Sequence, residues 1–184
     1  MLLAEPLLIT LFQNENFTVN DVLAASGSLR AYALGLLAFM AIKIFSPGYF
    51  SRQDTKTPVR IGIFAMLINM LMNVAFYLYG LAHVGLALAT SIAAFLNAGL
   101  LFWGLYKEKV FYFQSGWLLF VAQVFLANLV LSVFILSFSR ELAIWLTWSV
   151  STQLLNLCVL VFGGVFVYVV ALFLLGLRWQ QIYR

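Results

Sequence analysis

The chain has 184 residues, of which 65% are hydrophobic and only 9% are charged. A soluble domain carries about 25% charged residues, so this chain lacks the polar side chains to cover a water-exposed surface. The composition excludes an ordinary soluble protein and predicts a membrane protein, whose backbone groups must pair within each segment. The formal net charge of +4 does not indicate nucleic-acid binding, because the basic residues stand at the ends of apolar runs. The single cysteine, Cys158, excludes an internal disulfide.

An apolar stretch opens the chain at residues 1–12. It is too short to cross a bilayer, which takes about 20 apolar residues. We expect it to be the outer end of a helix that begins upstream, so that the chain is the C-terminal part of a larger protein. Five later stretches are long enough to span, at residues 28–46, 60–79, 84–105, 117–138 and 152–177. The predicted fold is all-α: a polytopic transmembrane helix bundle forming a single transmembrane region, with five full spans and one partial span.

The basic residues alternate between the two sides of the predicted bundle. If residues 47–57 are cytoplasmic, two basic residues, Arg30 and Arg140, fall outside the cytoplasmic span ends. The other eight lie at those ends: Lys43, Arg52, Lys56, Arg60, Lys107, Lys109, Arg178 and Arg184. An excess of Lys and Arg in cytoplasmic loops is the usual signature of orientation. The sequence therefore predicts a multi-pass protein of the cytoplasmic membrane with its C-terminus in the cytoplasm.

Turn-forming residues mark the connection between the first two full spans. Pro47 and Gly48 predict the end of one helix. Thr57 and Pro58 predict the start of the next helix, with Thr57 as its N-cap and Pro58 at its first helical position.

Residue types that carry catalysis are sparse in the sequence. His83 is the single histidine and falls in a predicted turn, where a polar turn residue is the simpler interpretation. The six carboxylates form no pair at one membrane depth, and the sequence has no HExxH, CxxC or P-loop motif. We therefore expect no enzyme activity, no catalytic residues, no certain metal site and no cofactor.

Uncharged polar side chains remain inside the predicted spans. Asn69 and Asn73 are four residues apart and share a helix face, and Thr90 and Asn97 lie in the next span. Interhelical hydrogen bonding is the simpler interpretation. The alternatives are a substrate pathway along Asn69, Asn73 and Asn97, and a sodium site of Asn69, Asn73 and Thr90, because amide and hydroxyl oxygens coordinate hard cations. Lys43 either extends to the membrane interface or faces an anionic substrate in that pathway.

The sequence of residues 43–58 is Lys-Ile-Phe-Ser-Pro-Gly-Tyr-Phe-Ser-Arg-Gln-Asp-Thr-Lys-Thr-Pro. It resembles a cytoplasmic loop of the MurJ/MviN family, a branch of the multidrug/oligosaccharidyl-lipid/polysaccharide exporter superfamily. The matching loop positions are Pro47, Gly48, Ser51, Arg52, Gln53, Asp54, Lys56, Thr57 and Pro58. Shorter matches, such as Leu71-Met-Asn73 and Gly116-Trp117, extend the resemblance over nearly the whole chain.

This resemblance implies a lipid II flippase of the bacterial inner membrane, which moves undecaprenyl-linked peptidoglycan precursor from the inner to the outer leaflet by alternating access. It implies the last third of a two-lobe bundle, whose partners are lipid II, the bilayer and the N-terminal lobe. It also implies coupling to sodium or to the membrane potential. The sodium positions of some relatives match Asn69, Asn73 and Thr90, although an aspartate of those relatives is Asn73 here. Finally, it implies a groove for the lipid tail beside the last two spans.

Two other functions are compatible with the sequence. A non-transporting membrane scaffold is one, because the charged cavity residues of the family belong mostly to the part that this chain lacks. A drug or ion exporter of the same superfamily is the other.

Overall fold

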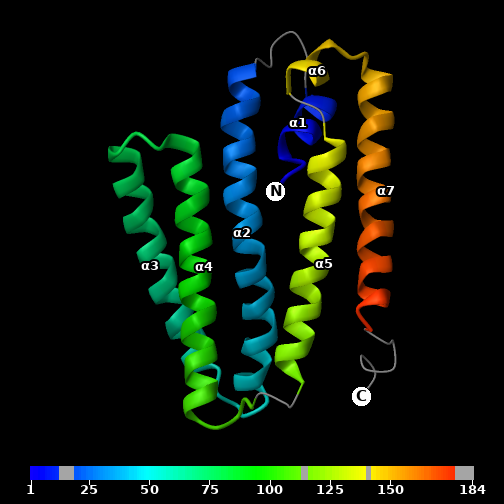
Figure 1. The fold of residues 1–184 in the computed structure, drawn as a ribbon. Helices are drawn as coiled ribbons and strands as arrows, with labels where there is room; N and C mark the ends of the chain where they lie inside the picture. Colours follow the sequence, from blue (N-terminus) through cyan, green and yellow to red (C-terminus); the bar gives the residue numbers. More distant parts are fainter. Residues whose placement is uncertain (13–18, 113–115, 140–141, 177–184) are drawn as a thin grey trace. The chain divides into compact units, whose positions relative to one another are not determined.

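The computed structural model describes residues 1–12, 19–112, 116–139 and 142–176, and all regular structure in these ranges is α-helical. Five of the helices are long and apolar enough to cross a membrane, which confirms the predicted fold class. They are α2 (Val19–Phe50), α3 (Lys56–Leu78), α4 (Ala82–Lys107), α5 (Trp117–Phe138) and α7 (Val150–Leu174) (Figure 1). Two shorter helices are α1 (Ala4–Phe12) and α6 (Leu142–Thr147), of which α6 has no counterpart among the predicted elements.

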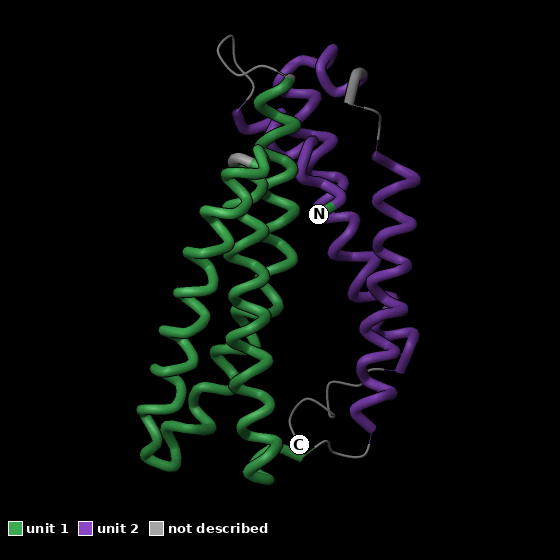
Figure 2. Tube along the Cα trace, turned by 90° about the vertical axis from the view of Figure 1, so that its left-hand side faces the viewer, with its two compact units in different colours: residues 1, 19–112 green, residues 2–18, 113–184 purple. Residues whose placement is uncertain are grey.

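The contacts divide the chain into two compact units, which are coloured separately in Figure 2. The first unit contains α2, α3 and α4, and the second contains α1, α5, α6 and α7. In the first unit α4 is the central helix, because α2 and α3 each pack mainly on α4 and hardly on one another. In the second unit α5 packs on α7, and α1 packs on α6 and α7.

Small residues let α2 and α4 approach closely. The hydroxyl of Ser91 in α4 donates a hydrogen bond of 2.6 Å to the carbonyl of Ala31 in α2. A Cβ added to Gly35 would lie 2.5 Å from the Ser91 Oγ and 3.1 Å from the Ser91 Cα, so a larger residue there would press on the side chain and backbone of α4. Ala38 packs nearby against Ala94 of α4. Lipid tails are as apolar as leucine, so close packing and hydrogen bonds of this kind hold membrane helices together.

The C-terminal end of α2 is held by one aromatic side chain. Tyr49 is 1% exposed and packs with Leu101 and Leu105 of α4. Its hydroxyl donates a hydrogen bond of 2.8 Å to the carbonyl of Leu101, and Gly104 leaves room for that hydroxyl because it has no Cβ. The prediction that α2 ends at Pro47 was wrong, since the helix continues through it to Phe50. Packing of the last turn offsets the hydrogen bond that proline cannot donate.

A short turn connects α2 to α3. The N–H of Asp54 donates to Tyr49 O at 3.1 Å and the N–H of Gln53 donates to Phe50 O at 2.9 Å, with Gln53 at φ +60°. This is a Schellman cap, in which glycine usually takes the left-handed position. The Asp54 carboxylate then accepts from the N–H groups of Lys56 and Thr57 at 3.2 and 3.1 Å. The prediction of Thr57 as N-cap was therefore wrong, because α3 begins at Lys56 and Asp54 satisfies its first N–H groups.

Glycines also let α5 and α7 approach closely. A Cβ on Gly163 would lie 3.1 Å from the ring of Phe134, and one on Gly164 would lie 3.2 Å from Leu131. Ala127 of α5 is fully buried in the same unit. In the short helix α6 of the same unit, the side chain of Trp145 is buried, at 1% exposure.

Candidate functional site

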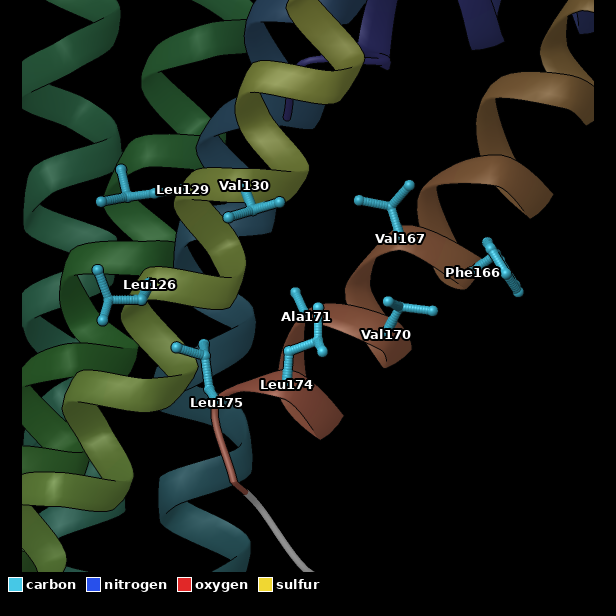
Figure 3. A pocket seen from close by; sticks show the side chains of 9 residues that line it. All are labelled: Leu126, Leu129, Val130, Phe166, Val167, Val170, Ala171, Leu174 and Leu175. Carbon is cyan, nitrogen blue, oxygen red and sulfur yellow. The ribbon is translucent and has the colours of Figure 1, made fainter.

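An apolar groove lies between α5 and α7, with a volume of about 450 Å³. Its nine lining residues are all aliphatic or aromatic: Leu126, Leu129, Val130, Phe166, Val167, Val170, Ala171, Leu174 and Leu175. Val130 and Val167 reach toward one another across it (Figure 3). The size falls in the range of about 300–1,000 Å³ that is usual for small-molecule sites. With no polar group on its walls, this groove suits a hydrocarbon chain rather than a polar or ionic ligand.

Helix periodicity aligns the α7 wall of the groove. Val167, Ala171 and Leu174 follow one another at spacings of four and three residues, which places them on one face of α7. Ala171 is 8% exposed and is the smallest residue of the lining, so the groove owes its depth at this point to a missing side chain. At the end of α7 the side chain of Gln123 donates a 2.8 Å hydrogen bond to the carbonyl of Leu175. The sequence placed Gln123 in a span but assigned it no partner.

A polar stripe runs along the side of α3 that faces α4. Ile61, which packs on the α4 core, and the buried Ala65 continue at the same four-residue spacing to Asn69 and Asn73. Among the residues that the structure describes, the side-chain oxygens of Asn69, Asn73 and Asn97 are buried and have no hydrogen-bond partner. A buried amide oxygen without a partner costs about 1–3 kcal/mol, so such atoms usually meet water, an ion or a ligand.

The other predicted pathway residues differ in their surroundings. The Thr90 hydroxyl donates a 2.9 Å hydrogen bond to the carbonyl of Leu86 in its own helix, which leaves its oxygen lone pairs available. Thr90 and Asn97 are seven residues apart and lie on one face of α4. Lys43 is exposed on α2, one turn before Pro47. The structure thus provides three buried acceptors and one hydroxyl in one unit, and an exposed cation on a different helix.

The residues of the loop motif form the cap between α2 and α3 and an ion pair beside it. Arg52 pairs with Glu108 at the end of α4 through exposed side chains. Hydrogen bonds from the Thr57 side chain and backbone lower the pKa of the Asp54 carboxyl below its ordinary value. Of the other motif positions, Ser51 donates a 3.2 Å hydrogen bond to the carbonyl of Gly48. Most of the motif therefore has a structural purpose, which is to join α2, α3 and α4 at one end of their unit.

The model of the family described as lipid II flippase MurJ matches residues 1–159, which include the capped loop, the polar stripe and the α5 wall of the groove. The chain belongs to the MurJ family. It is 46% identical over 183 residues to a probable lipid II flippase MurJ of Vibrio cholerae, covering 99% of this chain and 34% of that protein. The chain is 43% identical over 176 residues to the Haemophilus influenzae protein of the same name, covering 96% of this chain and 34% of the relative.

A Burkholderia cenocepacia protein, named lipid II flippase MurJ, is 39% identical over 129 residues, which are 70% of this chain and 25% of that protein. The chain spans about a third of the length of the first two curated relatives. The α7 wall of the groove lies beyond the residues matched by the MurJ family model, but the Vibrio cholerae relative aligns over 99% of the chain. With five helices able to span and membership of this family, the chain is a multi-pass membrane protein.

Proposed function

We propose that this chain supplies the hydrocarbon-binding part of a lipid II flippase, which moves undecaprenyl-linked precursor from the inner to the outer leaflet. The apolar groove between α5 and α7 is the observation that carries the proposal. All nine lining residues have hydrocarbon side chains, and a polyprenyl chain is a hydrocarbon along its whole length. The names of the MurJ relatives supply the substrate class.

Shape decides how tightly such a groove holds a chain. A polyprenyl tail gains little hydrophobic free energy on leaving lipid, because lipid tails are as apolar as the groove walls. Binding then depends on van der Waals contact, which is lost wherever the walls and the chain do not fit. Ala171 provides the depth for that fit. In this mechanism the tail stays in an apolar environment while the polar head crosses by alternating access of two lobes, and no covalent bond changes.

The two asparagines of the polar stripe, Asn69 and Asn73, are proposed to bind a sodium ion together with Thr90 of α4. Asn69 and Asn73 present buried oxygens that lack hydrogen-bond partners among the described residues, and the Thr90 oxygen retains lone pairs. Such oxygens fit a hard cation. A bound ion would supply positive charge and would compensate these acceptors, as the amides turn their oxygens toward it. Asn73→Leu should then remove any sodium dependence of transport, whereas an unchanged sodium dependence would favour interhelical packing as the purpose of the stripe.

The proposed location is the bacterial inner membrane, with the α2–α3 loop and the C-terminus in the cytoplasm. The loop carries Arg52, and Lys56 is the first residue of α3. Lys107 is the last residue of α4, and the next residue, Glu108, pairs with Arg52. Basic residues on this side are consistent with cytoplasmic placement. Cysteine-accessibility mapping from each side of the membrane tests this: reagent access to position 56 from the periplasm would contradict it.

A chimera tests the proposed function. This chain replaces the aligned third of the Vibrio cholerae relative, and the chimera is expressed in bacteria depleted of their own flippase. Growth with normal lipid II export is expected. A chimera that reaches the membrane at wild-type level but restores neither growth nor export would overturn the proposal. Dye export without lipid II export would favour a drug exporter.

A further inference from the structure

Two glutamines form hydrogen bonds near the opposite ends of α7. Gln123, in the second turn of α5, donates a 2.8 Å hydrogen bond to the carbonyl of Leu175 at the end of α7. Gln153, in the first turn of α7, donates a 2.8 Å hydrogen bond to the carbonyl of Trp145 in α6. It also lies 3.4 Å from the carbonyl of Trp148. One bond therefore joins α5 directly to α7, and the other joins α7 to the segment that follows α5.

Both acceptors are carbonyls at helix ends. Leu175 is the C-cap residue of α7, and Trp145 lies in the last turn of α6, where carbonyls have no intrahelical partner four residues ahead. Trp145 also accepts the N–H of Trp148 at 3.3 Å. Breaking the Gln123 bond leaves its amide and the Leu175 carbonyl to find other partners, whereas the Trp145 carbonyl keeps the Trp148 N–H. Gln123 is therefore suited to hold the end of α7 against α5.

Between these two bonds, α5 and α7 meet through apolar side chains and through glycines that let the two helices approach closely. Gly163 and Gly164 pack against Phe134 and Leu131. Close packing of small residues brings helices together but forms no directional bond that sets their separation. The groove begins next to the first glutamine bond, because Leu175 is both its lining residue and the Gln123 acceptor.

We propose that Gln123 is a positioning residue, which fixes the separation of α5 and α7 beside the groove and so presets the width of the groove. This inference rests on the proposed function, in which the groove holds a polyprenyl chain. When the width is preset, a larger fraction of the molecules already has the binding arrangement before the polyprenyl chain arrives. The apparent affinity for the polyprenyl chain rises in proportion to that fraction. Gln123 does not belong to the groove lining, so it does not touch the polyprenyl chain in this scheme.

Double electron–electron resonance measures distances between spin labels on the full chain in lipid nanodiscs, and these distances test the positioning role. In a Cys158→Ser background, labels replace Phe120 and Phe173, which are 44% and 71% exposed. Gln123→Met keeps the size of the side chain and removes the donor. We expect it to broaden the distance distribution between the labels. The matched control is Asn128→Leu, because the Asn128 amide donates within its own helix, to the carbonyl of Val124 at 2.8 Å, and the distance distribution of this variant should match the wild type.

A photoreactive undecaprenyl phosphate then measures binding to the same variants. One intramembrane hydrogen bond is worth about 0.6 kcal/mol, so crosslinking at low probe concentration should fall about threefold in Gln123→Met and stay unchanged in Asn128→Leu. If Gln123→Met does not fold, Gln123→Leu provides the same test with the same labels. Wild-type distances and crosslinking in the folded Gln123 variant would overturn the inference. Broadened distances with no crosslinking of the wild type would uphold the positioning role and overturn the proposed function.

Discussion

Gly35→Ala should destabilise the first unit through one close contact. The added Cβ would lie 2.5 Å from the Ser91 Oγ and 3.1 Å from the Ser91 Cα, and the second of these atoms is backbone. Rotating the hydroxyl away breaks its 2.6 Å hydrogen bond to Ala31, at a cost of about 0.6 kcal/mol. The backbone clash costs about 1–3 kcal/mol as overpacking. Alanine returns about 1 kcal/mol of helix propensity, so we expect a net loss of about 0.6–2.6 kcal/mol.

Unfolding by sodium dodecyl sulfate in mixed micelles, followed by tryptophan fluorescence, measures this loss on the full chain. Gly99→Ala in α4 is the matched control, because its added Cβ meets no atom within 4 Å. The control should be as stable as the wild type or up to about 1 kcal/mol more stable. Ser91→Ala combined with Gly35→Ala should cost less than the two single changes together, because the closest contact is gone. Equal stability of the Gly35→Ala and Gly99→Ala variants would refute the reasoning.

Three further predictions address the loop and the groove. Gln53→Gly should stabilise the chain by about 0.5–1 kcal/mol in the same unfolding assay, because Gln53 has φ +60°. The lowered pKa of Asp54 implies a stabilising contribution that is present above the unfolded-state pKa and lost as pH falls through the folded-state pKa, below about 4. Asp54→Asn, which keeps the acceptor, should flatten the unfolding profile between about pH 2 and 5. Ala171→Trp should fill the groove and lower undecaprenyl-probe crosslinking at least about tenfold, whereas Val169→Trp, outside the groove lining, should not.

Hydrophobic runs of bilayer length predicted the five long helices well, because the length and composition of a span are properties of the segment itself. The ends of the helices were harder to predict. Pro47 was expected to end α2, but the packing of Tyr49 two residues later keeps the helix intact. Thr57 was expected to cap α3, but the preceding turn brings Asp54 to the free N–H groups first.

The site shows the same division between local and tertiary information. The spacing of Asn69 and Asn73 predicts that they share a helix face, and the structure buries the oxygens of both, while their role in a pathway or sodium site stays a prediction. Gln123 has no local signal, because its acceptor lies 52 residues away at the end of another helix. The depth of the groove at Ala171 depends on which side chains face it from α5, and one sequence does not specify that pairing.

Translocation of fluorescent lipid II in proteoliposomes tests the central claim most directly. The Vibrio cholerae chimera containing this chain is compared with the same chimera carrying Ala171→Trp or Val169→Trp. The groove account predicts transport by the unmodified chimera and by Val169→Trp, and loss of transport in Ala171→Trp at equal incorporation. Equal transport by all three chimeras would contradict the claim that the α5–α7 groove holds the lipid chain.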